Sequence, residues 1–200
     1  MRKNGKILSE VWQLKKITYI TGNRQKIESA KYALKPLGFE VDNQKLEIPE
    51  IQADDVSEVA MYSAKMAAEE LQVPVMTSDL GLFIKSLKGF PGVYTKYVYY
   101  TIGIDGLLRL MAGTEERLAY FKEVIAYCEP GSEPVSFEAY TYGTIGLNRS
   151  LSRDKNWDYV FIPKGAPTFL SDIPKEDKWL YWSVDGYTKL ADYLEKQKSI

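Results

Sequence analysis

Residues 17–28, ITYITGNRQKIE, hold the pattern from which the fold of this chain follows. The four β-favouring residues 17–20 predict a short buried strand, and residues 21–23 interrupt it. Apolar residues then recur at helical spacing and predict a helix over 24–34. A strand that turns at a glycine and opens a helix leaves backbone N–H groups unpaired at the helix start, and such groups can bind a phosphate.

Lys26 lies on the first turn of this predicted helix, so its ammonium group can add a point charge at the same place. Two interpretations remain open for this stretch alone: a phosphate site, or an ordinary strand–turn–helix with a solvated lysine. The stretch matches neither the GxGxxG nor the GxxxxGK(S/T) fingerprint of nucleotide-binding loops. The ligand therefore has to be inferred from other parts of the chain.

The composition excludes several kinds of site. The chain has 200 residues and no histidine, which removes Ser-His-Asp and Cys-His catalysis and histidine-bound zinc. Catalysis would then rest on carboxylates, lysines and a hard metal ion held by oxygen atoms. The single cysteine, Cys128, cannot form an internal disulfide and is typical of a reducing compartment, so we expect a cytoplasmic protein.

Charge and hydropathy exclude two kinds of partner. The formal net charge is −1, which gives no support for binding a nucleic-acid polymer or an anionic membrane. No run of about 18 apolar residues is present, so we expect no transmembrane helix. The apolar run near the N-terminus is too short for a signal peptide, and we interpret residues 1–16 as a leader before one domain that spans 17–200.

Beyond the first helix, the pattern predicts further elements in this order: a strand over 39–48, a helix from Asp55 to 71, a strand over 74–78 that ends at Asp79, an extended segment over 80–84, a loop over 87–96, a helix over 105–112, two antiparallel strands over 119–128 and 135–146, a strand over 158–162 and a helix over 185–196. Helices and strands alternate in the first half, whereas strands cluster in the second. This order predicts an α/β protein with a mixed central β-sheet, flanking helices and a β-rich lobe.

Chargeable residues come at the ends of four of these elements, where strand-and-helix proteins often bind ligands. They are the turn that contains Lys26, then Glu50, Asp79 and Lys96. Two lysines and a helix start suit a polyphosphate, and two carboxylates suit a magnesium ion. Each residue also has an ordinary explanation: Glu50 as a solvated acid, Asp79 as a turn cap, and Lys96 as a surface lysine.

The order and context of these residues resemble one family, the inosine/xanthosine triphosphate pyrophosphatases, which remove damaged purine nucleotides from the precursor pool. The resemblance runs from Ile17 to about Leu194. It rests on TGNRQK (21–26), LEIPEIQ (46–52), SDLGLFI (78–84), GFPGVYTKY (89–97), WDYVFIPKG (157–165) and PKEDK (174–178). The combination of these motifs in this order makes the resemblance specific.

The resemblance implies a mixed α/β fold of two lobes with the active cleft between them, in a homodimer. It also implies an enzyme that needs Mg²⁺ and cuts a nucleoside triphosphate between the α- and β-phosphates, releasing the monophosphate and pyrophosphate. By position, Asp79 would be the central acid and Lys26 the catalytic lysine, with Glu50 and Asp79 holding the metal. The substrate-binding positions that it implies are Thr21, Gly22, Asn23, Lys26, Lys96, Trp157, Asp158, Lys178 and Ser183.

The chain departs from the family pattern where the family reads the purine base. A phenylalanine that would stack on the base is replaced by Lys155, and the His-Arg pair that would read its 6-oxo group is replaced by Ser183 and Val184. Losing a charged donor to a keto oxygen costs about 1.5–3 kcal/mol, or roughly 10- to 150-fold in affinity. The base-reading half of the site is therefore expected to differ from that of the family.

A second departure lies beside Asp79, where Ser78 replaces an acid of the family pattern and Leu80 replaces a threonine. Two explanations remain open. The chain is either an active pyrophosphatase with an altered base preference, in which Trp157 or Trp182 stacks on the base, or a relative that binds nucleotide but hydrolyses it poorly because Ser78 removes a metal ligand. We favour the first, because the acids and lysines of the phosphate half all remain.

Overall fold

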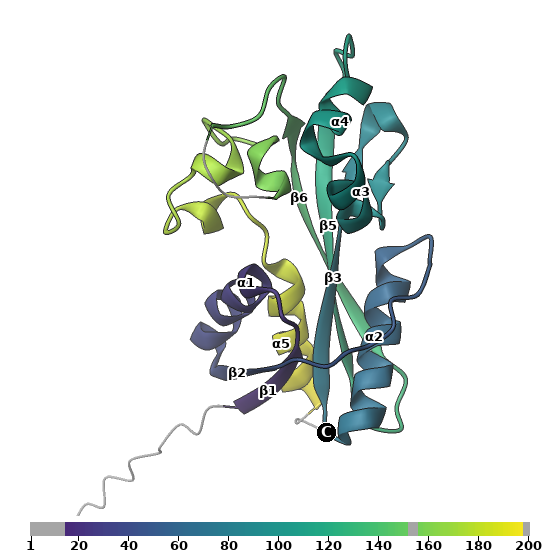
Figure 1. Cartoon of the computed structure of the whole chain (residues 1–200). Coiled ribbons are helices and arrows are strands. Elements are labelled where there is room, and N and C mark those ends of the chain that lie inside the picture. Colours follow the sequence, from purple (N-terminus) through teal and green to yellow (C-terminus); the bar gives the residue numbers. More distant parts are fainter. Residues whose placement is uncertain (1–14, 152–155, 198–200) are drawn as a thin grey trace, which may run out of the picture.

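The structure, a computed structural model, describes residues 15–151 and 156–197 of the chain. Its centre is a twisted seven-stranded sheet, and five α-helices flank it in this described part (Figure 1). The strands are β1 (Lys15–Ile20), β2 (Phe39–Gln44), β3 (Val75–Ile84), β4 (Pro91–Gly92), β5 (Leu118–Cys128), β6 (Val135–Ile145) and β7 (Phe161–Pro163). The helices are α1 (Arg24–Leu34), α2 (Val56–Leu71), α3 (Thr95–Thr101), α4 (Gly103–Leu110) and α5 (Asp185–Gln197).

The sheet mixes parallel and antiparallel strands, in the order β2-β1-β3-β5-β6-β7, with β4 paired to β3 beside this path. β1 runs parallel to β2 and to β3, and the later pairs are antiparallel. The two long strands expected in the second half are β5 and β6, which pair along almost their whole length. The predicted α/β class with a mixed central sheet is confirmed.

The side of β3 that faces β1 is only partly paired. β1 pairs with β3 at Val75 and Met76, and β4 pairs with it at Leu82 and Phe83. Between these contacts, no strand in the described part of the chain pairs with residues 77–81 on this side, although β5 pairs with all of β3 on the other. This opening, which we name the β3 gap (residues 77–81), leaves backbone groups available to side chains from elsewhere.

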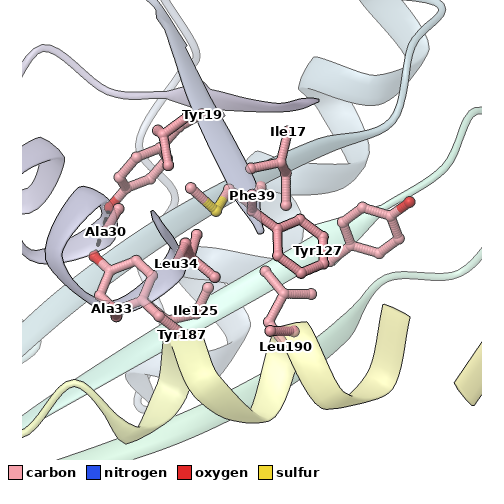
Figure 2. Packing of buried hydrophobic residues seen from close by; sticks show 13 residues of the cluster. Ile17, Tyr19, Ala30, Ala33, Leu34, Phe39, Ile125, Tyr127, Tyr187 and Leu190 are labelled. Carbon is pink, nitrogen blue, oxygen red and sulfur yellow. Dashed lines mark hydrogen bonds between the residues drawn. The ribbon is translucent and has the colours of Figure 1, made fainter. Parts of the chain in front are cut away.

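Three clusters of buried apolar residues hold the helices on the sheet. One packs α1 and α5 against β1 and β2, and includes Tyr19, Leu34 and Tyr187 (Figure 2). The second packs the alanine-rich face of α2 against the opposite face of the sheet. The third lies under α3 and α4. Figure 1 shows the resulting two lobes, with α1, α2 and α5 toward one end of β3 and with α3 and α4 toward the other.

Two strand boundaries differ from those expected from the sequence. β2 ends at Gln44, short of the expected 48, because β1 ends opposite this residue. The segments 74–78 and 80–84 form one strand, β3, so Asp79 lies in mid-strand and not at a strand end. Pairing with β5 along the whole of β3 keeps the strand continuous through this acid.

The segments expected as a loop and as a late strand also differ. Residues 87–96, expected as a loop, contain β4 and the start of α3. The helix was not predicted because the tyrosines of α3 do not recur at the spacing of an apolar helix face. Where a strand was expected over 158–162, residues 157–159 form a 3₁₀ turn and only the short β7 follows. Two residues assigned to the leader, Lys15 and Lys16, belong to β1. Residues 1–14 of the leader lie outside the described residues.

The residue that opens α2 both caps the helix and joins it to the sheet. The Asp55 carboxylate accepts a hydrogen bond from the Ser57 amide at 2.7 Å and pairs with Lys122 of β5 at 3.0 Å. The hydrogen bond from Ser57 and the nearby Lys122 ammonium lower the pKa of Asp55 from 3.8 to about 2. The carboxylate therefore stabilises the folded chain above about pH 4 and loses this effect as the pH falls toward about 2.

Asp55→Ala removes this cap, and we expect the free energy of unfolding at neutral pH to fall by about 1 kcal/mol. The ion pair with Lys122 is partly exposed and adds little to that loss. The difference from the unaltered protein should shrink between about pH 4 and about pH 2, where Asp55 takes up a proton. Urea unfolding followed by circular dichroism measures both effects. Asp54→Ala, an exposed neighbour of the cap, is the control, and an equal loss there would contradict the capping role.

Candidate active site

The turn between β1 and α1 places Lys26 beside the β3 gap. The Asn23 side chain caps α1, accepting hydrogen bonds from the amides of Gln25 and Lys26 at 2.9 and 3.4 Å. Thr21 Oγ1 accepts a bond from the Asn23 amide at 3.1 Å and so fixes the turn. Lys26 Nζ donates a hydrogen bond to the Ser78 carbonyl oxygen at 2.6 Å. The lysine thus binds an open backbone group of β3 and brings a positive charge into the gap.

The helix start is less open to an anion than the sequence predicted. Two of its amides, those of Gln25 and Lys26, already bind the Asn23 side chain, and an anion could use them only by displacing it. The backbone does not require a glycine at Gly22, where φ is not positive and a Cβ would meet only the Lys45 side chain, at 3.4 Å or more. The Lys26 ammonium is therefore the main group that this turn offers to a phosphate.

Asp79 lies in the β3 gap with charges from three other segments around it. The residue is half-buried, and burial raises the pKa of its carboxyl group. The charges of Lys26 and Lys96 oppose that rise, whereas the charge of Glu50 adds to it. Lys96 Nζ in turn pairs with Glu50 Oε1 at 2.6 Å, and both side chains are well exposed. Asp79 therefore lies within electrostatic reach of the other three charged residues that the sequence singled out.

The loop before α3 holds Lys96 at this place. Thr95 Oγ1 donates a hydrogen bond to the Gly92 carbonyl and accepts one from the Leu82 amide, both at 2.6 Å, which ties the loop to β3. Gly92 has a φ of 59°, in the left-handed region that favours glycine. A Cβ on Gly81 would lie 2.9 Å from the Gly92 carbonyl oxygen, so the loop can approach β3 only over a glycine. These glycines therefore shape the backbone around the site.

The two carboxylates at the gap are suitable ligands for a magnesium ion. Mg²⁺ prefers oxygen ligands and is commonly held by one or two carboxylates together with phosphate oxygens and water. Glu50 and Asp79 supply two such groups, and a cation between them would relieve their mutual repulsion. Over residues 15–151 and 156–197, no cluster of three or more His, Cys, Asp or Glu side chains could hold a metal. The other ligands would therefore come from a substrate and from water.

A small cavity of about 60 Å³ lies between α1 and residues 175–182. Asp158 and Lys178, both expected to bind substrate, line it and pair with each other at 3.0 Å. Gln25 of α1 donates a hydrogen bond to the same Asp158 carboxylate at 3.3 Å. Lys26 also lines this cavity, so the cavity and the charged cluster adjoin at this residue.

The β3 residues of the site are divided between the two faces of the sheet. Because side chains alternate along a strand, Asp79 points to the face that packs on α2, whereas Ser78 and Leu80 point to the face that packs on α1 and α5. Ser78 Oγ accordingly lies 2.5 Å from the Tyr19 hydroxyl. Ser78 is thus directed away from Asp79, and the expectation that this serine removes a metal ligand is not supported.

Two residues expected to bind substrate have roles in the fold. Trp157 is 6% exposed, and its indole N–H donates to the Thr95 carbonyl at 3.1 Å, so a base cannot stack on its buried ring. Ser183 stands at the start of α5, where its hydroxyl accepts a hydrogen bond from the helix backbone. Trp182, the alternative stacking residue, does line the cavity. Lys155, at the position of the family's stacking residue, lies outside the described residues.

One residue of the cavity was not expected from the sequence. Glu123 of β5 is 4% exposed and lines the cavity. Burial raises the pKa of its carboxyl group, and the charge of Lys26 opposes the rise. The sequence held one signal, the adjacent charges Lys122 and Glu123 within an apolar strand. Lys122 forms ion pairs with Asp55 and Glu138 on the other face of the sheet, which account for its charge. Among the described residues, no such ion pair accounts for the charge of Glu123.

A larger hollow of about 1250 Å³ lies elsewhere, on β3, β5, β6 and β7 beside the loop that precedes α3. Its lining is rich in aromatic residues, among them Phe83, Phe90, Tyr94 and Tyr142. None of the residues predicted to bind metal or substrate lines it. The hollow is therefore separate from the charged site.

The sequence matches known proteins over most of its length. Residues 17–181 match the model of the Ham1 family. A protein of Methanopyrus kandleri named dITP/XTP pyrophosphatase is 41% identical over 163 residues, which cover 82% of this chain and 87% of that protein. Proteins of the same name from Thermococcus kodakarensis and Methanosarcina acetivorans are 41% and 39% identical, over 82% and 84% of this chain and 88% and 96% of theirs.

Solved structures share the fold. The Ham1 protein of Staphylococcus aureus superposes with a TM-score of 0.73 at 22% identity, covering 92% of this chain and 100% of that chain. A HAM1 protein from Coxiella burnetii gives 0.77 at 20% identity, covering 91% of this chain and 99% of that chain. At these identities the likeness concerns the fold alone.

Lys26→Met removes the ammonium group and keeps an unbranched side chain. We expect binding of inorganic tripolyphosphate with Mg²⁺ to weaken about 10- to 150-fold, since a hydrogen bond to a charged group contributes about 1.5–3 kcal/mol. Isothermal titration calorimetry gives the dissociation constant. Lys31→Met, on the exposed side of the same helix, should bind as the unaltered protein does. Equal binding by both variants would remove Lys26 from the phosphate site.

Proposed function

The chain belongs to the Ham1 family, and we propose that it is a nucleoside triphosphate pyrophosphatase. It hydrolyses non-standard purine nucleotides such as ITP, XTP and dITP to the monophosphate and pyrophosphate, and so removes them from the precursor pool. Relatives that are 39–41% identical over most of the chain bear the name dITP/XTP pyrophosphatase. The observation that carries the proposal is the cluster of Lys26, Glu50, Asp79 and Lys96 at the β3 gap.

The roles follow from the charges of this cluster. Hydrolysis of the anhydride bond between the α- and β-phosphates places negative charge on phosphate oxygens, which Lys26 and Lys96 would offset. Asp79, half-buried between them, would orient the attacking water and accept its proton. Glu50 and Asp79 would hold a magnesium ion, which would supply further positive charge to the phosphate oxygens. In a chain without histidine, Asp79 is the group placed to do this work.

The edge of the base would enter the small cavity that Asp158 and Lys178 line. Trp182 borders the same cavity and offers an aromatic face on which a base can stack. Neither Ser183 nor Val184 can supply the positive charge of the family's purine-reading pair. We therefore propose a base preference that differs from that of typical family members, with the phosphate half of the site retained.

The competing function is a nucleotide-binding protein that hydrolyses its ligand slowly. One observation favours it: Lys96 already pairs with Glu50, so a metal ion must displace the lysine before the acid can bind it. The pair is exposed, with side chains 70% and 71% accessible. Because exposed ion pairs contribute little, at most about 1 kcal/mol, the displacement is easily offset by a bound metal and substrate. The catalytic function is therefore preferred.

We also propose a cytoplasmic homodimer. Support for the dimer comes from the aromatic hollow, where Phe90, Tyr94 and Tyr142 are 39%, 45% and 58% exposed and form an apolar surface that a second copy could cover. Cys128 is buried and forms no disulfide, in keeping with a reducing compartment. No helix among the described residues is long and apolar enough to cross a membrane. Light scattering should give twice the 22.8 kDa mass of the chain, and the mass of a single chain would contradict the dimer.

Asp79→Asn keeps the size of the side chain and removes its charge. We expect pyrophosphate release from ITP with Mg²⁺ to fall by about 100-fold or more, because a positioned general base contributes a factor of that order. Phosphorus NMR of the products identifies monophosphate and pyrophosphate directly. Asp192→Asn, exposed on α5, is the control.

Two outcomes would change the assignment. Activity that survives in Asp79→Asn would remove this residue from the mechanism. An unaltered protein that binds triphosphates tightly but releases no pyrophosphate from any standard or modified nucleotide would establish the competing, non-catalytic function.

A further inference from the structure

Glu123 is a buried acid that the mechanism above does not use. The residue lines the cavity between α1 and residues 175–182 and is 4% exposed. Oε1 accepts a hydrogen bond from the Tyr187 hydroxyl at 2.9 Å. No donor among the described residues lies at hydrogen-bond distance and angle from Oε2, although the Trp182 indole N–H is close enough to oppose the rise that burial causes in the pKa of this carboxyl group. Leaving a buried carboxylate oxygen without a donor is costly, so a ligand that supplies one would bind favourably there.

A chain of hydroxyl groups holds the other oxygen in place. The Tyr187 hydroxyl lies 3.0 Å from that of Tyr19, which lies 2.5 Å from Ser78 Oγ (Figure 2 shows the two tyrosines). Each hydroxyl has one proton to donate, and the order Ser78 to Tyr19 to Tyr187 to Glu123 satisfies every member. Both tyrosines are fully buried. Tyr187 therefore fixes Oε1, and the position of Oε2 is set with it.

Glu123 does not belong to the metal site. It lies opposite Leu80 in the β3–β5 ladder, so its side chain shares the face of Leu80 and points away from Asp79. The charge of Lys26 acts on both acids, because this lysine lies in the gap between the two faces. Glu123 is thus on the same side of the lysine as Asp158, where the nucleoside would bind.

The other acids that line this cavity are already engaged. Asp158 pairs with Lys178 at 3.0 Å, and Glu28 pairs with Lys175 at 2.8 Å. Within the described residues, Glu123 is the cavity acid without an ion-pair partner at hydrogen-bond distance. The cavity volume of about 60 Å³ admits the edge of a base and not a whole ring system. A base would therefore meet Glu123 through the hydrogen-bonding groups on its edge.

We propose that Glu123 is a specificity residue, whose Oε2 accepts a hydrogen bond from an N–H group on the edge of the bound nucleobase. The inference rests on the proposed nucleotide-binding function. In its ionised form, which the charge of Lys26 favours, the Glu123 carboxylate accepts hydrogen bonds and cannot donate them. Bases with a hydrogen on N1, as in hypoxanthine, xanthine and guanine, are therefore favoured over bases that present only a lone pair there. Glu123 would thus discriminate between bases, which Ser183 and Val184 cannot do through a positive charge.

Three ligands distinguish recognition of the base by Glu123 from a general effect on nucleotide binding. They are the α,β-methylene analogues of ITP, which carries a hydrogen on N1, and of purine riboside triphosphate, which does not, together with inorganic tripolyphosphate, which has no base. By titration calorimetry with Mg²⁺, the unaltered protein should bind the ITP analogue about 10- to 150-fold more tightly than the purine riboside analogue. Glu123→Gln keeps an oxygen for Tyr187 but turns an amide NH₂ toward the cavity. It should remove this preference and leave tripolyphosphate binding unchanged.

Glu129→Gln is the matched control. Glu129 follows the end of the same strand and also accepts a hydrogen bond from a tyrosine, Tyr127, at 3.0 Å, but it does not line the cavity. This variant should keep the preference for the ITP analogue.

Three results would overturn the assignment of Glu123. They are equal affinity of the unaltered protein for the two analogues, an unchanged preference in Glu123→Gln, and an equal loss of all three ligands in that variant. The first comparison needs no variant, so it holds even if Glu123→Gln fails to fold. Failure of the proposed function itself would look different, because the unaltered protein would then bind none of the three ligands, tripolyphosphate included.

Discussion

The site depends on one interruption of the central sheet, where β1 stops on the edge of β3 before β4 begins. Backbone groups at such an edge seek hydrogen-bond partners. Here the Ser78 carbonyl finds one in Lys26 Nζ, at 2.6 Å. If β1 were longer, its backbone would occupy that edge and exclude the lysine. The short first strand and the turn that follows it are therefore what bring a positive charge to the middle of the sheet.

The gap also joins the two faces of the sheet. Asp79 lies on the face that packs against α2, and Glu123 lies on the face that packs against α1 and α5. Lys26 acts on both acids from between them. In the proposed function, metal and phosphate chemistry takes place on the face of Asp79, and the nucleoside is recognised on the face of Glu123. A single lysine then contacts the part of the substrate that passes from one face to the other.

Local sequence signals predicted the elements that local interactions determine. α1 and α2 have caps at Asn23 and Asp55 and regular apolar faces, and both begin and end close to where the sequence placed them. The alternation of helices and strands also predicted the mixed sheet. The charged residues of the gap were identified because they stand in motifs whose order is specific, although the same order could not show that Asp79 lies in mid-strand.

The features that the sequence did not predict depend on strand register and on tertiary packing, which cannot be derived from local sequence patterns. Whether Glu123 faces a cavity or solvent is decided by its pairing with Leu80 across the ladder. Trp157 was interpreted as a stacking residue, but its burial and its bond to Thr95 are tertiary properties. The Asn23 side chain likewise accepts hydrogen bonds from amides that the sequence predicted to be free for a phosphate.

The most direct test of this account is a crystal structure of the protein with Mg²⁺ and the α,β-methylene analogue of dITP. The account predicts that the phosphates lie at the β3 gap between Lys26 Nζ and Asp79, with the metal on Glu50 and Asp79. Phosphates bound in the aromatic hollow, or a gap in which neither Lys26 nor Asp79 touches the phosphates or the metal, would contradict it.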